Sequence, residues 1–403
     1  MTKKSSTPAI RFKGFTDTWE QRELSEIADK VTEKNAGLQY VETFTNSAEF
    51  GIISQRDFFD HDIAKLGSLD GYYIVKNEDF VYNPRISTSA PVGPINRNKL
   101  GRTGVMSPLY TVFRPHDIDA TYLEYFFKCG YWHSFMNFNG DSGARSDRFS
   151  IKDNVFFQMP IPIPHIDEQR KIGELLTRLD NLITLHQRKY DKLTNVKKSM
   201  LEKMFPKNGS NVPEIRFKGF TEAWEQRKLG DVAKYRNGKA HENDISEQGK
   251  FIVVNSKFVS TNGEVRKFSN KQIEPLFKNE IAFVLSDVPN GRAIARTFLV
   301  DKNDKYTLNQ RIAGITPIEG TCPYFLHILM NRNKYFLQFD DGAKQTNLSV
   351  DDVIEFAEYY PSSEEQQQIG NFFRQLDNLI TLHQRELEKL KNLKKACLEK
   401  MFV

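Results

Sequence analysis

Apolar side chains recur at alternating intervals of three and four residues in two long stretches, 167–205 and 364–402. This spacing keeps them on one face of an α-helix, and a repeat sustained over more than four heptads is typical of a coiled coil. Each helix would be about 55 Å long at 1.5 Å per residue. The positions on this face, here called the predicted seam, are Ile172, Leu175, Leu179, Leu182, His186, Leu193 and Val196, and Ile369, Phe372, Leu376, Leu379, His383, Leu390 and Leu393.

The ends of both helices are marked in the sequence. Pro164 and Pro361 stop the strand-like segments before them, and Ser362 with Glu365 is typical of a capping box. Acidic residues follow at each helix start, and lysines gather near each helix end, which matches the helix dipole. We interpret those lysines as a solvated face rather than as phosphate ligands.

The chain also repeats itself. Residues 10–24 recur at 215–229 with 12 of 15 positions identical, and residues 167–205 recur at 364–402 with 24 of 39 identical. Similarity nearly vanishes between these blocks, so two copies of one frame enclose two different inserts. Neutral drift after duplication would explain the divergence, but drift would not spare the frame so selectively. We therefore favour inserts with different specificities.

This repeat predicts five parts of the chain. They are a first domain over 1–166, a first coil helix over 167–205, a linker over 206–214, a second domain over 215–362 and a second coil helix over 363–403. With a whole domain between them, the helices can return and pair antiparallel. His186 and His383 would then approach each other near the middle and fix the register, although an outward or singly bonded histidine is an equal alternative.

Composition narrows the class of protein. A hydrophobic content of 39% allows real cores, and 31 Phe with 15 Tyr favour aromatic cores over base-stacking platforms. The net charge of +5 permits nucleic acid without requiring it, and three distant cysteines exclude a zinc ribbon or a disulfide framework. A polar N-terminus and the lack of an apolar run of about 18 residues lead us to expect a cytoplasmic protein with no membrane contact.

The motifs of the common DNA enzymes are missing. An amino-methyltransferase needs an Asn/Asp-Pro-Pro-aromatic turn, and Asn83-Pro84-Arg85 lacks both the second proline and the aromatic. Neither a GxGxxG turn nor a GxxxxGK[ST] loop is present, and the histidines show no metal spacing. A metal-dependent nuclease is harder to exclude because its residues are weakly specified. We predict no catalytic residue and no metal ligand on this chain.

Basic and amide side chains fall in the loops of both inserts. Arginine and lysine bond guanine, and asparagine and glutamine bond adenine, so these residues are candidate base readers. For each one alone a solvated surface role is the stronger interpretation, whereas the clusters together favour DNA reading. The candidates are Asn83, Arg85, Arg97, Arg102, Arg145 and Arg148 in the first insert, and Asn290, Arg292, Arg296, Gln310, Arg311, Lys344, Gln345 and Asn347 in the second.

The whole chain resembles a type I restriction–modification specificity (S) subunit. The resemblance rests on the paired Trp-Glu-Gln-Arg-x-Leu openings at Trp19 and Trp224, on the Pro…Glu-Gln helix starts at Pro164 and Pro361, and on the matching coil helices. It implies an α+β fold in which two pseudo-repeated α/β target recognition domains are joined by two long antiparallel coiled-coil helices.

The resemblance also implies a division of labour. Each domain would read half of a bipartite double-stranded DNA target, while the coil sets the gap and recruits two modification subunits. Those subunits would bind S-adenosylmethionine and methylate adenine at N6, and two restriction subunits would use ATP and Mg for translocation and cleavage. The chain itself would carry no cofactor. The alternatives are a coiled-coil scaffold that joins two protein partners without touching DNA, and, less favoured, a stand-alone DNA enzyme.

Overall fold

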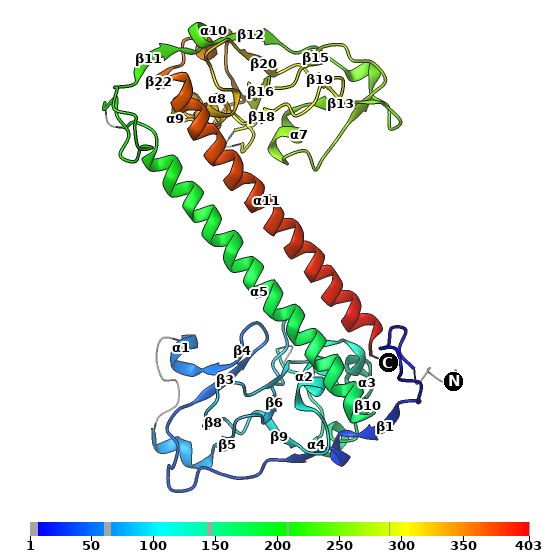
Figure 1. Ribbon diagram of the computed structural model, residues 1–403. Coiled ribbons are helices and arrows are strands. Elements are labelled where there is room, and N and C mark those ends of the chain that lie inside the picture. The colour runs from blue at the N-terminus through cyan, green and yellow to red at the C-terminus, as the bar shows by residue number, and fades with distance from the viewer. Residues whose placement is uncertain (1–6, 60–65, 143–146, 208, 290, 403) are drawn as a thin grey trace. The chain divides into compact units, whose positions relative to one another are not determined.

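The computed structural model describes residues 7–59, 66–142, 147–207, 209–289 and 291–402. It divides into two compact units, which are residues 1–187 with 385–403, and residues 188–384. Each unit holds one β-rich domain together with parts of both long helices, α5 (Ile166–Lys203) and α11 (Ser363–Lys400) (Figure 1). We call the β-rich parts the first domain and the second domain.

The first domain is built on a sheet with the strand order β2-β9-β6-β7. All three residues of β6 are buried, which suits a strand covered on both faces. The hairpin β3–β4 and the antiparallel pair β5–β8 lie beside the sheet, and helices α2 and α3 follow it. Bounds in this domain are β2 (Ala28–Lys30), β3 (Phe44–Ser47), β4 (Gly51–Ser54), α1 (Gln55–Phe59), β5 (Tyr73–Val75), β6 (Phe80–Tyr82), β7 (Ile95–Arg97), β8 (Gly104–Met106), β9 (Thr111–Pro115), α2 (Ala120–Lys128), α3 (Tyr131–Asn139) and α4 (Asp153–Phe156).

The second domain repeats this plan with the order β12-β20-β16-β18 and adds a sheet of order β14-β13-β19-β15. In the added sheet β13 and β19 run parallel. Bounds are α6 (Leu229–Val232), β12 (Ala233–Asn237), β13 (Phe251–Val254), α7 (Ser256–Ser260), β14 (Phe268–Ser269), β15 (Pro275–Leu276), β16 (Ile281–Val284), β17 (Ser286–Asp287), β18 (Thr297–Leu299), β19 (Tyr306–Leu308), β20 (Ile312–Pro317), α8 (Pro323–Met330), α9 (Lys334–Leu337), β21 (Thr346–Asn347) and α10 (Val350–Ile354).

The repeated opening block forms an edge strand in each domain. Strand β1 (Glu20–Glu23) pairs antiparallel with β10 (Pro160–Ile163), and β11 (Glu225–Lys228) pairs in the same way with β22 (Ala357–Tyr360). The tryptophans just before these strands are 5% and 2% exposed, so they are core anchors, as the sequence predicts. The frame therefore begins beside the strand that leads into its own long helix.

The glutamate of each Glu-Gln pair ties the opening block to the long helix. Glu168 accepts hydrogen bonds from Arg11 Nε and Nη2 at 2.7 and 2.8 Å, and Glu365 accepts two from Arg216 at 2.7 Å. Both carboxylates are almost fully buried. A buried carboxylate needs such a bidentate partner, which explains why arginine and glutamate recur together in both copies.

The neighbouring glutamine holds the first helix that follows the central sheet. Gln169 Oε1 accepts from the main-chain N–H of Asp119 at 2.8 Å, and Gln366 Oε1 accepts from that of Cys322 at 3.1 Å. Asp119 and Cys322 are the N-cap residues of α2 and α8. The Pro…Glu-Gln signature is thus a structural joint between a domain and its coil helix.

Within each unit the long helices run antiparallel and join a domain core. In the first unit Lys394 pairs with Asp180 at 2.5 Å, and Phe402 packs on Tyr122 in the first-domain core. In the second unit Lys197 pairs with Asp377 at 2.5 Å, and Phe205 packs on Trp224, Phe325 and Phe373. Both carboxylates also accept a tyrosine hydroxyl at 2.8 Å.

Two members of the predicted seam lie on the solvent side of α11. Leu379 is 43% exposed and Leu393 is 48% exposed, whereas Leu387 and Cys397 are buried at 7%. A straight α-helix repeats every 3.6 residues, so its packed face drifts away from a strict heptad pattern. The seam as a helix–helix contact stays a prediction, and so does the approach of His186 to His383.

Candidate nucleic-acid interface

The predicted readers of the first domain meet around one groove. Arg85 and Arg148 face each other in an antiparallel bridge, and with Asn83 they line a groove of about 470 Å³. The bridge is held by two main-chain hydrogen bonds, from Ile86 to Asp147 and from Phe149 to Pro84. The 147–149 segment therefore lies alongside the residues that follow β6.

The second domain builds the same arrangement. Strand β17 continues from β16 and pairs with β21, which places Asn347 opposite Ser286. Leu348 donates its main-chain N–H to Leu285 at 2.8 Å, in the same way as Phe149 does to Pro84. Residues 147–149 and 346–348 thus occupy equivalent places on the two frames.

The reader cluster of the second domain is rich in amides. Gln345 donates to Ser286 Oγ at 2.8 Å and lies 3.5 Å from Asn347 Oδ1, while Lys344 is exposed beside them. Leu285 also donates to the carbonyl of Arg311, so this arginine lies next to the same strand. Gln345, Asn347, Lys344 and Arg311 are all exposed, which leaves them accessible to a ligand.

Asp287 shapes the loop that carries Arg292. Its carboxylate accepts the main-chain N–H groups of Val288, Ala293 and Ile294 at 2.9, 2.5 and 3.1 Å. A Cβ added at Gly291 would lie 2.1 Å from this carboxylate, so a larger residue there would have to displace the Asp287 side chain. Asp287 is not among the site residues predicted from the sequence, because its role depends on how this loop folds back on it.

Four predicted readers are engaged within the chain. The Arg97 side chain is 9% exposed and lies 3.3 Å from Glu124. Arg102 makes a bidentate pair with Glu42 at 2.8 and 2.7 Å, and this hydrogen bond lowers the pKa of Glu42. Gln310 donates to Glu242 at 2.5 Å, and Arg296 donates to a main-chain carbonyl. These four contacts give the side chains structural roles, whereas Arg145 and Asn290 lie outside the described residues.

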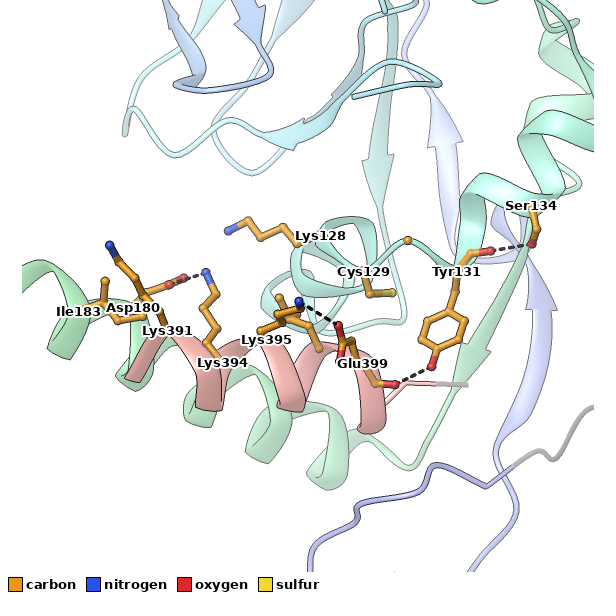
Figure 2. Close-up of a pocket in the computed structure, with 12 residues that line it drawn as sticks. Lys128, Cys129, Tyr131, Ser134, Asp180, Ile183, Lys391, Lys394, Lys395 and Glu399 are labelled. Carbon is orange, nitrogen blue, oxygen red and sulfur yellow. Dashed lines mark hydrogen bonds and ion pairs between the residues drawn. The ribbon is translucent and has the colours of Figure 1, made fainter. Parts of the chain in front are cut away.

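A second groove, of about 850 Å³, lies in the first unit beside α2, α3 and the end of α11. Figure 2 shows several lysines around it, with Lys394 directed to Asp180 and the Tyr131 hydroxyl to the carbonyl of Glu399. Lys128 pairs with Glu124 at 2.6 Å. Because carboxylates offset these lysines, the groove is a weaker site for a polyanion than the bridge of two arginines.

The comparison with protein families decides what kind of frame this is. The model of the type I restriction modification DNA specificity domain matches residues 16–195 and 221–392. The chain belongs to this family. The family named from the sequence is thereby confirmed, and its two matches coincide with the two copies of the frame.

Individual relatives agree with the family. The chain is similar to the MjaVIII type I restriction enzyme specificity subunit of Methanocaldococcus jannaschii, with 26% identity over 266 residues that cover 61% of each chain. It is also similar to the putative MjaX specificity subunit of that organism, with 22% identity over 61% of this chain and 59% of the relative. These matches span about three fifths of the curated relatives.

The fold is shared with a solved specificity subunit. The crystal structure of the type I restriction–modification S subunit from M. genitalium matches with a TM-score of 0.63 and 14% identity, over 98% of this chain and 99% of that one. The predicted α+β architecture of repeated domains and long antiparallel helices is therefore confirmed.

Members of the specificity family are non-catalytic subunits and carry no cofactor of their own. Within the described residues, no three His, Cys, Asp or Glu side chains are grouped to hold a metal ion. None of the described helices combines the length and apolar character that a membrane span requires.

Proposed function

We propose that this chain is the DNA-recognition subunit of a type I restriction–modification complex, in which each domain reads one half of a bipartite double-stranded target. One observation carries the proposal. The clusters around Arg85–Arg148 and Gln345–Asn347 sit on equivalent strands of two near-identical frames, yet they present different chemistry. Different side chains on equal supports are what two readers of different half-sites need.

The reading residues are proposed in two tiers. The exposed or groove-lining side chains, which would contact DNA, are Arg85, Arg148, Arg292, Arg311, Lys344, Gln345 and Asn347. Asn83, Arg97, Arg102, Arg296 and Gln310 would support those contacts through the bonds they make within the chain. Arg145 and Asn290 stay candidates from the sequence.

The coil helices are proposed to recruit two modification subunits, which in turn assemble with two restriction subunits. Exposed leucines on both helices support a docking role, because apolar side chains that gather on a surface are typical of protein–protein contacts. Leu185 and Leu393 in the first unit are 45% and 48% exposed, and Leu379 and Leu382 in the second unit are 43% and 52% exposed. S-adenosylmethionine, ATP and Mg would belong to those partners.

The experiment is to co-express the chain with a type I modification subunit and to map methylated adenines across the host genome. A single bipartite motif with a fixed gap is the expected result. Replacing Lys344, Gln345 and Asn347 with Ala should relax one half of that motif and leave the other half unchanged. The matched control is Lys302→Ala, an exposed lysine of the same domain away from the cluster.

Two results would contradict the proposal. A complex that forms but shows no motif, and no salt-dependent DNA binding, would support the protein-joining scaffold. Relaxation of both half-sites by the triple substitution would contradict the assignment of one domain to one half-site.

A further inference from the structure

The first-domain groove carries a feature that the division into half-sites does not explain. Its wall includes the rings of Phe58 and Phe59, which come from α1, and the side chain of Leu109. Phe50 extends this wall, with its ring centroid 6.2 Å from that of Phe58. We call Phe50, Phe58 and Phe59 the aromatic cluster.

The aromatic cluster is exposed, whereas most phenylalanines of the first domain are buried in its core. Phe50 is 61% exposed, Phe58 40% and Phe59 37%, and Leu109 beside them is 60% exposed. A monomer does not gather large apolar side chains on its surface without a binding role. The wall therefore calls for a ligand with an apolar part.

The lining of the same groove holds two arginines and one acidic residue, Glu49. Arg85 and Arg148 are cross-strand neighbours, and like charges placed directly opposite each other destabilise a strand pair. The nearest carboxylate, that of Asp147, lies 3.9 Å from Arg85, which is too far for a hydrogen bond. An anion such as a backbone phosphate would offset this repulsion.

The amides that line the groove are already engaged by the chain. Asn83 donates to the carbonyl of Asn46 at 2.7 Å and accepts from the N–H of Arg85 at 3.0 Å. Asn46, 1% exposed, donates to the carbonyl of Val81 and accepts from Asn96 at 2.7 Å. These amides hold the floor of the groove in shape, so the two arginines and the apolar wall are the groups that can contact DNA there.

We propose that the half-site read by the first domain contains a thymine whose 5-methyl group packs against Phe58 and Phe59, with a neighbouring phosphate at Arg85 and Arg148. Thymine is the base that offers an apolar group in the major groove, and phenylalanine is a known partner for its methyl. The inference rests on the proposed function and adds the chemistry by which the first half-site is read.

The test uses the full chain in complex with its modification subunit and synthetic duplexes that carry the mapped motif. Each thymine of the first half-site is replaced in turn by deoxyuracil, which removes only the methyl group. One replacement should weaken binding about fourfold, the effect of a single buried methyl-sized group. The same replacements in the second half-site are the control, and synthetic duplexes contain no 5-methylcytosine that could supply the methyl instead.

Protein variants complete a double-mutant cycle. In the double variant Phe58→Ala, Phe59→Ala, binding should weaken and the deoxyuracil effect should disappear. Phe138→Ala removes a ring that is 89% exposed elsewhere in the first domain, and it should preserve both the affinity and the deoxyuracil effect. Retained reading of the second half-site shows that the double variant is folded.

The outcomes separate this inference from the proposed function. If wild-type complex prefers no sequence at all, the proposed function fails and this inference with it. If binding is sequence-specific but no deoxyuracil position matters, or if the effect persists in the double variant, the thymine contact is wrong while the function stands. If the double substitution weakens binding to the thymine and the deoxyuracil duplexes by the same factor, the rings act as a wedge between base steps instead.

Discussion

The two domains carry different side chains at equivalent positions of a shared frame. Both place a loop cluster on the strand that continues from the central sheet, but the first lines it with arginines and exposed rings while the second lines it with amides and a lysine. The joints between each domain and its long helix, Arg11–Glu168 and Arg216–Glu365, are nearly identical. The two domains thus combine different loop chemistry with the same joint.

The joints themselves differ in one hydrogen bond. Trp19 Nε1 donates to Glu168 at 3.2 Å, whereas among the described residues Trp224 Nε1 is buried with no acceptor. Glu365 therefore depends more heavily on its arginine than Glu168 does. We expect the two units to respond differently to changes at this joint and at three other places.

The largest effect is expected from the aromatic residue at the end of each long helix. Phe402 is 2% exposed in the first-domain core, and Phe205 packs on the aromatic core of the second domain. Phe402→Ala should lower the free energy of unfolding of the first unit by about 3–5 kcal/mol because it leaves a cavity. Phe205→Ala should act on the second unit and by less, since Phe205 is only partly buried.

Hydrogen exchange measured by mass spectrometry on each unit checks this prediction. Faster exchange in the first domain of Phe402→Ala, with the second domain unchanged, is the expected pattern. Faster exchange in the second domain alone would show that Phe402, just beyond α11, does not stabilise the first domain.

The next effect is expected at the joints. Arg216→Ala leaves the buried Glu365 without its bidentate partner, and the cost should be about 3 kcal/mol. Arg11→Ala should cost less because Trp19 still donates to Glu168. Chemical denaturation of both variants measures the difference, and equal losses would mean that the tryptophan bond contributes nothing.

Much of this frame could be predicted from the sequence, because its parts are local patterns. Heptad-like spacing, helix caps and the repeated motif indicated both long helices and the paired domains. The aromatic cluster could not be predicted, because phenylalanines are usually core residues. The sequence does not show that the fold leaves Phe58 and Phe59 exposed. Nor could the role of Asn83, whose bonding depends on Asn46, far away in sequence.

Acid should destabilise the two units to different extents, and this difference in stability should be smaller than the effects above. Burial lowers the pKa of His327 on α8 to about 4, against an ordinary value of 6.5, and its Nδ1 is buried without a partner among the described residues. Between these values the unfolded chain binds a proton that the folded chain excludes, so the stability of the second unit falls as pH drops from 6.5 to 4. At pH 5 the loss should be about 2 kcal/mol.

The first unit should lose less stability in this pH range. Burial also lowers the pKa of His133 on α3, but its ring is only half-buried, so its protonation should cost less than that of His327. Burial alone would raise the pKa of Glu124 on α2, but Lys128, Lys99 and Arg97 lower it below the ordinary value of 4.5. Its contribution is present above that value and is lost only as pH falls through the lowered pKa. Hydrogen exchange at pH 5 and pH 7 should therefore show destabilisation of the second unit first, and His327→Leu should remove that difference.

The smallest effect on stability is expected at Gly291. There we expect DNA recognition by the second domain to change more than its folding. In Gly291→Ala the new Cβ displaces the Asp287 carboxylate, which now holds three main-chain N–H groups of the loop. The loop is exposed, so unfolding should change by less than about 1 kcal/mol. Arg292 would move with it, and recognition of the second half-site should weaken while the first half-site is read normally. Adenine methylation mapped in cells that express this variant measures both halves at once, and an unchanged motif would show that the geometry of this loop does not matter for reading.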